Sequence, residues 1–474
     1  MANFFKAKTN KPASPQVKDI LTVNIDKLDS HGCGVAYYRK KPVFISGSLP
    51  NESVDIRLVE QKNKYARGKL LSVNKASTSR VEAKCQHFSV CGGCDLQHLE
   101  YTEQLNFKHS KVSSLFSRSD IDAKIVQHLP WQAPIKSAPW HYRRKARIGV
   151  QFDKLAKATI GFRQKATNQL VAVKSCPVLV EAAADIFPLL STLIDRLTVK
   201  KAIGHIEVLY ADDAEYMLGN QGGANSAKKL VLLVRQIRAI NDHDRQIWHE
   251  YAVKHHWQVC FQESDQNEET ALSYNTKNQL SYPLIENINI RFSSDDFVQI
   301  NQAVNVAMVE QALNWLMPEA NDHVLDLFCG LGNFSLPLAS KVSKVIGVEG
   351  VQQMVDKASA NAAYNKLDNC RFFQADLNSQ WLAAESLHPW VNNHFTKVLL
   401  DPARAGAEIA VEQIAKMAIP TVLYVSCEPS TLARDCQILL SQGYKIEKIG
   451  LIDMFSQTKH VETMVLLKRL HSSK

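Results

Sequence analysis

Short alternating runs of apolar and polar residues characterise the chain after residue 16. The runs at 21–25 and 42–45 are separated by turns that contain glycine. A period of two places apolar side chains on one face of a strand, and closely spaced short strands are typical of small barrels. We therefore predict a small β-barrel over residues 17–76. The polar, Lys- and Pro-rich residues 1–16 are predicted to form a disordered arm.

The hydrophobic pattern changes further along the chain. Residues 178–290 combine apolar runs such as 229–234 with helical periodicity and contain no recognisable catalytic motif. From about residue 291, apolar strands alternate with helices, which is the pattern of a doubly wound parallel sheet. We predict an α/β protein with a central domain over residues 77–290 and a doubly wound domain over residues 291–474.

Length and composition agree with several domains. A chain of 474 residues, 45% of them hydrophobic, is too long for one ordinary core, so two or three domains are expected. No apolar stretch has the length of a signal peptide or membrane span, so we expect a cytoplasmic protein without membrane contact. Ten cysteines are too sparse for a disulfide scaffold and indicate a reducing compartment.

Positive charge is concentrated at one end of the chain. Residues 1–80 hold 15 Lys and Arg against 6 Asp and Glu, whereas the other 394 residues hold 41 of each kind. A basic face confined to one end indicates an anionic polymer as partner, and a solvated charged tail is the simpler alternative.

Three successive strands of the doubly wound domain end in acidic residues. The first carries Asp326 and runs into a Gly-x-Gly turn at Gly330 and Gly332, where a ligand can approach bare backbone. The next two strands end at Glu349 and Asp376, where carboxylates can accept hydrogen bonds from ribose hydroxyls and lie beside an adenine. A dinucleotide site is the rival interpretation, but its fingerprint has a third glycine or alanine where this chain has Ser335.

Two further strands end in reactive side chains followed by proline. Residues 398–406 carry Asp401-Pro402, and residues 422–435 carry Cys427-Glu428-Pro429. A buried structural thiol is the ordinary role of a free cysteine at a strand end. The flanking motifs favour a catalytic role instead.

A cysteine cluster precedes the mixed α/β region. Cys85, Cys91 and Cys94 follow a Cys-x5-Cys-x2-Cys spacing, and Cys176 is followed by proline. Thiolates at this spacing suit an iron–sulfur cluster or a structural zinc, and the spacing alone leaves both open.

These motifs carry a resemblance to known enzymes. The C-terminal segments 297–302, 398–406, 422–435 and 460–465 together resemble the RNA 5-methyluridine methyltransferase family, and the strand ends resemble a class I S-adenosylmethionine fold. The N-terminal barrel, with Gly32-Cys33-Gly34 and the basic stretch at 62–69, resembles a TRAM domain, an OB-like barrel of RNA-modifying enzymes.

The resemblance implies roles for individual residues. Cys427 is the expected nucleophile and Glu462 the expected base, while Asp401 is expected to bind the polar edge of the target base. S-adenosylmethionine is the expected cofactor, and the expected contacts to it are Gln299, Phe328, Asn333, Glu349, Asp376 and Asp401.

The chemistry of uracil explains why such residues are needed. Carbon 5 is too electron-poor to attack a methyl sulfonium, so a thiolate must first add to carbon 6. After methyl transfer a base must remove the proton from carbon 5 before the thiolate leaves. One departure from many family members is Glu428 in place of Asn, and a carboxylate there is predicted to raise the pKa of the Cys427 thiol.

The resemblance also implies a substrate branch. Ribosomal members carry a four-iron [4Fe-4S] cluster on the pattern of Cys85, Cys91, Cys94 and Cys176. The tRNA branch lacks barrel and cluster, and a second ribosomal branch has the cluster alone. A chain with both is expected to act, as a monomer, on one uridine of 23S ribosomal RNA.

Three alternatives remain open. One is a dual-site rRNA methyltransferase of the same architecture. Another is a radical-S-adenosylmethionine methylthiotransferase, although the cysteine spacing and the N-terminal barrel argue against it. The third is a non-enzymatic RNA-binding assembly factor, which an intact set of Cys427, Asp401 and Glu462 disfavours.

Overall fold

The computed structural model describes residues 20–213, 228–263, 270–271, 280–383 and 389–470. The predicted arm at residues 1–16 lies outside these ranges. The chain divides into two compact units, one of residues 1–84 and 94–107 and one of residues 85–93 and 108–474. None of the helices in the described ranges combines the length and apolar character needed to span a bilayer.

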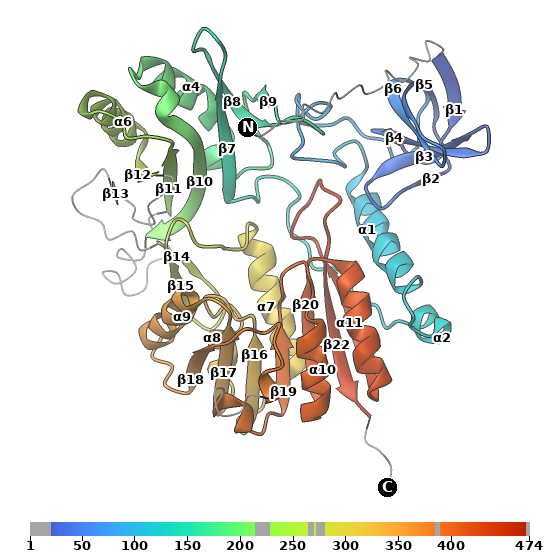
Figure 1. The fold of residues 1–474 in the computed structure, drawn as a ribbon, viewed down its shortest axis with the longest axis vertical. Helices are drawn as coiled ribbons and strands as arrows, with labels where there is room; N and C mark the ends of the chain where they lie inside the picture. Colours follow the sequence, from blue (N-terminus) through green and yellow to red (C-terminus); the bar gives the residue numbers. More distant parts are fainter. Residues whose placement is uncertain (1–19, 214–227, 264–269, 272–279, 384–388, 471–474) are drawn as a thin grey trace, which may run out of the picture. The chain divides into compact units, whose positions relative to one another are not determined.

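The smaller unit contains a six-stranded sheet in the order β1-β5-β6-β4-β3-β2 (Figure 1). All pairs are antiparallel except β4 with β6. Alternation along the strands buries one face around Val43, Ile45, Val54 and Ile56, as the period-two pattern predicts. The strands are β1 (Ile20–Asn24), β2 (Lys27–Leu28), β3 (Cys33–Tyr38), β4 (Lys41–Ser46), β5 (Ser53–Gln61) and β6 (Ala66–Lys75).

Two helices, α1 (Tyr101–Phe116) and α2 (Ala123–Gln127), follow the cysteine-rich segment. Beyond them, a nine-stranded sheet has the order β13-β12-β11-β10-β7-β8-β9, with β14 pairing to β10 and β15 to β14. Its strands are β7 (Lys145–Phe152), β8 (Ala158–Arg163), β9 (Leu170–Ala172), β10 (Ile203–Asp213), β11 (Lys228–Gln236), β12 (Trp257–Glu263), β13 (Thr270–Ala271), β14 (Leu280–Pro283) and β15 (Asn289–Phe292). Its helices are α3 (Glu181–Ala184), α4 (Ile186–Arg196), η1 (Lys200–Ala202) and α6 (Asp242–His255).

The C-terminal sheet has seven strands in the order β18-β17-β16-β19-β20-β22-β21, with only β22 antiparallel to its neighbours. This confirms the predicted doubly wound sheet. Its strands are β16 (His323–Leu327), β17 (Lys344–Glu349), β18 (Cys370–Gln374), β19 (Lys397–Leu400), β20 (Thr421–Ser426), β21 (Tyr444–Ile452) and β22 (Glu462–Arg469). Its helices are α7 (Gln302–Leu316), α8 (Ser335–Ala339), α9 (Gln352–Tyr364), η3 (Pro389–Asn392), α10 (Glu408–Met417) and α11 (Pro429–Ser441).

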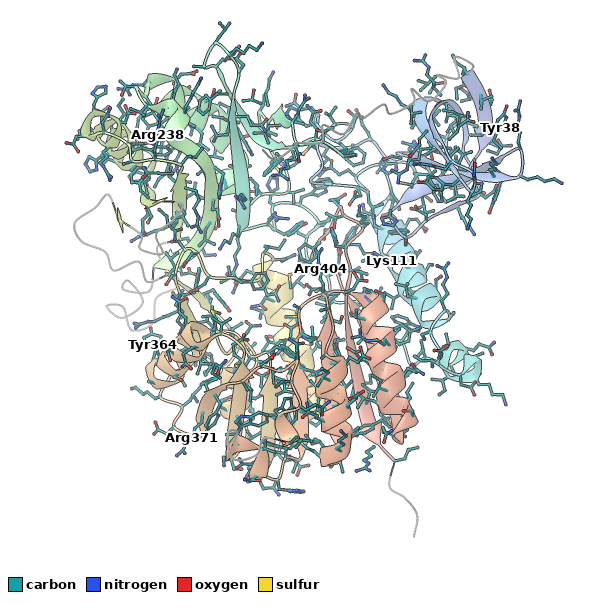
Figure 2. The ribbon with its side chains drawn as sticks, viewed as in Figure 1. Tyr38, Lys111, Arg238, Tyr364, Arg371 and Arg404 are labelled. Atoms are coloured by element: carbon teal, nitrogen blue, oxygen red, sulfur yellow. The ribbon has the colours of Figure 1, made fainter. Side chains whose placement is uncertain are left out.

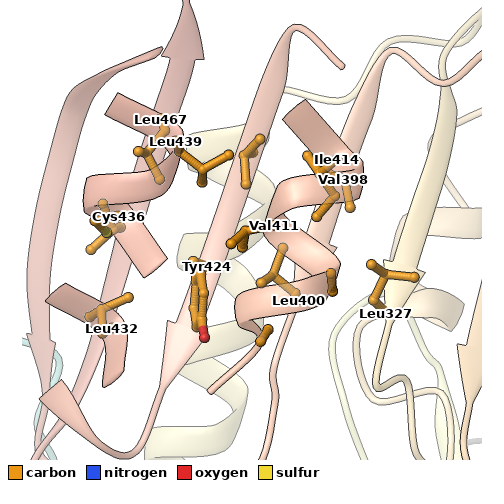
Figure 3. Close-up of a cluster of buried hydrophobic side chains, with 14 of the residues drawn as sticks. Leu327, Val398, Leu400, Val411, Ile414, Tyr424, Leu432, Cys436, Leu439 and Leu467 are labelled. Atoms are coloured by element: carbon orange, nitrogen blue, oxygen red, sulfur yellow. The ribbon is translucent and has the colours of Figure 1, made fainter. Parts of the chain in front are cut away.

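Helices cover both faces of this sheet. Val411 and Ile414 of α10 and Leu432 and Leu439 of α11 pack on alternate residues of β19, β20 and β22, as Figure 3 shows. Tyr424 of β20 lies in this core and donates its hydroxyl to Asp435 at 2.6 Å. On the opposite face, Trp315 of α7 packs against Gly450 of β21, where an added Cβ would lie 3.2 Å from the indole. Because both faces of the sheet are buried, the ends of its strands are held in fixed positions relative to one another.

Candidate active site

The carboxyl ends of β16, β17, β19 and β20 lie next to one another because their strands are parallel neighbours. The register pairs Leu327 with Val348 and with Leu400, and Leu400 with Tyr424. Ligand sites of open α/β sheets lie at this edge, where the strand order reverses beside the first strand. Phe328, Glu349, Asp401 and Cys427, which end or directly follow these strands, therefore lie at one edge of the sheet.

The turn after β16 is shaped for a ligand at bare backbone. Phe328, Gly330 and Gly332 have positive φ angles of 61°, 53° and 91°. The N–H of Gly330 donates to Oε2 of Glu349 at 3.1 Å, which joins this turn to the end of β17. An added Cβ at Gly330 would meet no atom within 4 Å, so open space borders the turn. This space and the nearby carboxylate fit the predicted cofactor.

The remaining predicted cofactor contacts are Asn333, Asp376 and Gln299, and each has hydrogen-bond partners within the chain. Asn333 and Asn305 exchange side-chain hydrogen bonds at 3.0 and 3.1 Å, and Tyr282 donates to Asn333 at 3.1 Å. Asp376 is exposed, and its carboxylate accepts from the N–H of Asn378 at 2.9 Å. The backbone carbonyl of Gln299 accepts from Nε of Arg144 at 2.8 Å.

Cys427, Glu462 and Asp401 form one electrostatically coupled cluster. The antiparallel register of β20 and β22 pairs Ser426 with Thr463, which are the sequence neighbours of Cys427 and Glu462. Burial and, less strongly, the charge of Asp401 together raise the pKa of the Glu462 carboxyl to about 8. Burial also raises the pKa of Asp401 to about 7. These carboxyls favour their neutral forms because they are withdrawn from water.

The thiol of Cys427 has a raised pKa of about 11, first because it is buried and then because of the charges of Glu462 and Asp401. Arg404, exposed on the loop after β19 and labelled in Figure 2, acts in the opposite direction and lowers it. The Oε2 atom of Glu462 is buried without a hydrogen-bond partner among the described residues. When Glu462 is ionised, this carboxylate oxygen, which has no hydrogen-bond partner among the described residues, can accept a proton from a bound substrate.

The predicted effect of Glu428 on the thiol has a different physical basis. Its carboxylate accepts from the N–H of Ser430 at 3.4 Å and from the hydroxyl of Ser430 at 2.8 Å, and so caps α11. The charges that raise the pKa of Cys427 are those of Glu462 and Asp401. The pKa is raised as predicted, but the attribution to Glu428 is wrong because capping directs this side chain to the helix.

Two residues of this edge were not among the predicted site residues. Asp326 is buried, with a pKa raised to about 7 by burial and, less strongly, by the charges of Asp401 and Glu349. Ser335 donates a hydrogen bond to its Oδ2, while Oδ1 has no partner in the described ranges. Arg404 is the second residue that was not predicted. Its position three residues after Asp401, in the segment Asp401-Pro402-Ala403-Arg404, could have indicated that it belongs to the site.

The cysteine cluster is brought together in part. Cys85, Cys91 and Cys176 belong to the larger unit, and Cys94 belongs to the smaller one. Burial raises the pKa of Cys91 and of Cys176, and the charge of Cys85 raises both further. Within the described ranges, no three His, Cys, Asp or Glu side chains are arranged to hold a metal ion.

Backbone pairing holds the loop that carries Cys91. The N–H of Gly92 donates to the carbonyl of Arg163 at 2.9 Å, and the N–H of Lys165 donates to the carbonyl of Val90 at 2.9 Å. An added Cβ at Gly92 would lie 3.0 Å from the Arg163 carbonyl, so this close approach favours glycine. Soft thiols held on such loops are chemically suited to iron–sulfur clusters.

Comparison with known proteins identifies the family. The model of the tRNA (uracil-5-)-methyltransferase family matches residues 100–470, and that of the TRAM domain matches residues 16–71. The chain belongs to the RNA uracil-C5 methyltransferase family. Methyltransferase activity and an N-terminal TRAM domain, both predicted, are thereby confirmed.

Individual family members cover nearly the whole chain. The 23S rRNA (uracil(1939)-C(5))-methyltransferase RlmD of Colwellia psychrerythraea is 57% identical, with 98% of this chain and 99% of the relative covered. The RlmD of Psychromonas ingrahamii is 44% identical over the same shares. The Pyrococcus abyssi tRNA (uracil-54, C5)-methyltransferase, solved with S-adenosyl-L-homocysteine, has a TM-score of 0.70 at 20% identity, covering 94% of this chain and 100% of that one. This last likeness shows the fold.

Proposed function

We propose that this family member methylates carbon 5 of the uridine at position 1939 of 23S rRNA. The position is that named for relatives 57% and 44% identical to this chain, each matched over nearly its whole length. The basic stretch of the barrel, with exposed Lys64, Arg67 and Lys69, supports an RNA partner because phosphates bind such side chains. We include in the proposal the cytoplasm as compartment, a monomer as active form, and the domain boundaries at residues 76 and 290.

The proposed mechanism is covalent and assigns three roles to the cluster. Cys427 adds as a thiolate to carbon 6 of the uracil, which makes carbon 5 nucleophilic. S-adenosylmethionine supplies a methyl group as an electrophilic sulfonium substituent. Glu462 then takes the proton from carbon 5, and the electrons of that bond expel the thiolate from carbon 6. The single observation that carries this assignment is the coupling of Cys427, Glu462 and Asp401 at one sheet edge.

Raised pKa values suit these roles. The ionised fraction of a carboxyl whose pKa is about 8, roughly a tenth at pH 7, can take a proton and return it to solvent, whereas an ordinary carboxylate is a weaker base. Asp401, with a pKa of about 7, can present either a donor or an acceptor to the polar edge of the uracil. The target base must leave its stack to reach all three side chains.

The cofactor is assigned to the turn after β16 and the neighbouring strand ends. Glu349 and Asp376 would bind the ribose and the region of the adenine, and Gln299, Phe328, Asn333 and Asp401 would complete the pocket. The open space beside Gly330 supports this assignment.

The proposal includes an iron–sulfur cluster on Cys85, Cys91, Cys94 and Cys176. Its support is the spacing of these thiols and their proximity: after burial, the charges of Cys85 and Cys91 raise the pKa of Cys176. Methylation needs no electron transfer, so we assign the cluster a structural or RNA-positioning role.

The decisive experiment transfers labelled methyl from S-adenosylmethionine to unmodified 23S rRNA and maps the product. We expect one 5-methyluridine at position 1939. Two labelled positions would mean a dual-site enzyme, and RNA binding without any label would mean an assembly factor; either result would overturn the proposal.

A further inference from the structure

A cavity of about 250 Å³ lies in the larger unit, lined by residues other than the cluster of Cys427, Asp401 and Glu462. Its walls come from the segment before β7, from β10, from the first residue of β11 and from the start of α7. The lining residues that matter chemically are Trp140, His141, Arg144, Tyr210, Asp212 and Lys228.

Arg144 provides a buried donor at this cavity. The residue is 5% exposed, and its guanidinium lies 4.5 Å from the ring centroid of Tyr282. Nε donates to Gln299 at 2.8 Å and Nη1 donates to Gln302, which holds the group in place. Nη2 is buried and has no hydrogen-bond partner among the described residues. A buried, fixed cationic N–H without an acceptor is costly, so a ligand that supplies an acceptor is stabilised there.

The rest of the lining is aromatic, basic and, at one point, acidic. Tyr210 lies under the Lys228 ammonium, which is 5.8 Å from the ring centroid. His141 and Lys228 are exposed. Asp212 is 5% exposed and its charge favours the cationic form of Arg144, so an acceptor lies near the buried donor.

We propose that this cavity binds one nucleotide of the RNA substrate other than the target uridine. The inference rests on the proposed function. The base presents an acceptor to Nη2 of Arg144 and a donor to Asp212, as base edges do in direct recognition. Tyr210 and Trp140 supply stacking surfaces, and Lys228 and His141 bind the flanking phosphates.

The cavity is joined to the methyltransferase site through a short segment. Asn301 and Gln302 of this segment line the cavity. Arg144, which also lines the cavity, donates a hydrogen bond to the carbonyl of Gln299 in the same segment. The lining of the cavity is therefore continuous in sequence with Gln299, a proposed contact of the cofactor. Because single-stranded recognition reads splayed bases one by one, such a second contact would select the correct loop among many uridines.

The test combines protein and RNA changes. Filter binding and methylation are measured with an rRNA fragment and with a series in which one nucleotide at a time near the target is made abasic. Tyr210→Ala and Lys228→Gln are compared with wild type and with Lys254→Gln, an exposed lysine of α6 outside the cavity.

We expect Tyr210→Ala to raise Kd and KM for RNA at least about fivefold, the usual effect of losing one stacked base, with kcat and the KM for S-adenosylmethionine unchanged. One abasic substitution should weaken wild type by a similar factor and leave Tyr210→Ala unaffected. The proposal is overturned if no abasic position behaves in this way, or if Lys254→Gln has the same effect. Absence of methylation by wild type, with these binding differences intact, would count against the proposed function alone.

Discussion

The charge of the Glu462 carboxyl raises the pKa of the Cys427 thiol, after the larger effect of burial, and the two residues adjoin the paired strands β20 and β22. The register pairs Ser426, the last residue of β20, with Thr463, the second residue of β22, and Cys427 and Glu462 are the next residues of the two segments. Nucleophile and base thus come from strands that are adjacent in space and about 35 residues apart in sequence.

Removing the thiol should abolish catalysis and spare binding. Cys427→Ala is expected to lower methyl transfer by at least about a thousandfold, because no other group in the cluster can add to carbon 6. RNA affinity should change less than about threefold, since phosphate contacts dominate it. Methyl-transfer assays and filter binding measure both, with Cys33→Ala in the barrel as the matched control. Substantial turnover by Cys427→Ala would rule out a covalent route.

Single-turnover methylation should accelerate with pH between 6 and 9. The raised thiol pKa of about 11 means that the thiolate fraction grows about tenfold per pH unit in this range. Glu462 becomes ionised over the same interval, and its charge raises the thiol pKa, so the rise in rate is less steep near pH 8 but keeps its sign. A pH–rate profile measures this. A rate that is already constant above pH 6 would contradict the raised pKa values.

Neutralising Glu462 should stabilise the fold at high pH. Its pKa is raised from 4.5 to about 8 on folding, so the carboxyl loses its proton at a lower pH in the unfolded chain than in the folded one. The contribution of the protonated carboxyl to the stability of the fold is therefore complete below pH 4.5 and is lost as pH rises through 8. Glu462→Gln is expected to raise Tm at pH 8.5 by at least about 2 °C and to leave it nearly unchanged at pH 5. Thermal unfolding at both values checks this, with Glu428→Gln as control. An equal change at both values would mean that the effect is not titration.

Much of the site could be predicted because strand ends and motif order are local in sequence. Asp326 and Glu349 lie at the carboxyl ends of β16 and β17, and the Asp401 and Cys427 motifs directly follow β19 and β20, so all of them mark the end of an apolar run. The cause of the raised thiol pKa could not be predicted, because capping of α11 by Glu428 depends on side-chain direction. The burial of Arg144 could not be predicted for a similar reason, because it depends on packing against Tyr282, which is far away in sequence.

The anaerobically purified protein is expected to be brown, with about four iron atoms per chain, if the cysteines hold the proposed cluster. Cys91→Ser should lose the visible absorbance and the iron, because the buried Cys91 thiol is one of the four proposed ligands. Elemental analysis and visible spectroscopy measure this, with Cys33→Ser as control. Stoichiometric zinc without iron would show a structural zinc site instead.

The central claim is that Glu462 completes a reaction that Cys427 begins, and blocking the second step should trap the first. Glu462→Gln keeps the shape and part of the hydrogen bonding of the side chain but removes its basic oxygen. Thiolate addition and methyl transfer precede proton removal, so the variant should accumulate a protein–RNA adduct that carries the methyl group.

The measurement is a denaturing gel of wild type, Glu462→Gln, Glu428→Gln and the double variant Glu462→Gln with Cys427→Ala, each incubated with rRNA and methyl-labelled S-adenosylmethionine. The account predicts a labelled, slowly migrating band for Glu462→Gln that disappears in the double variant and is not enriched in Glu428→Gln. Normal turnover by Glu462→Gln, without the band, would contradict the assignment of Glu462 as the base.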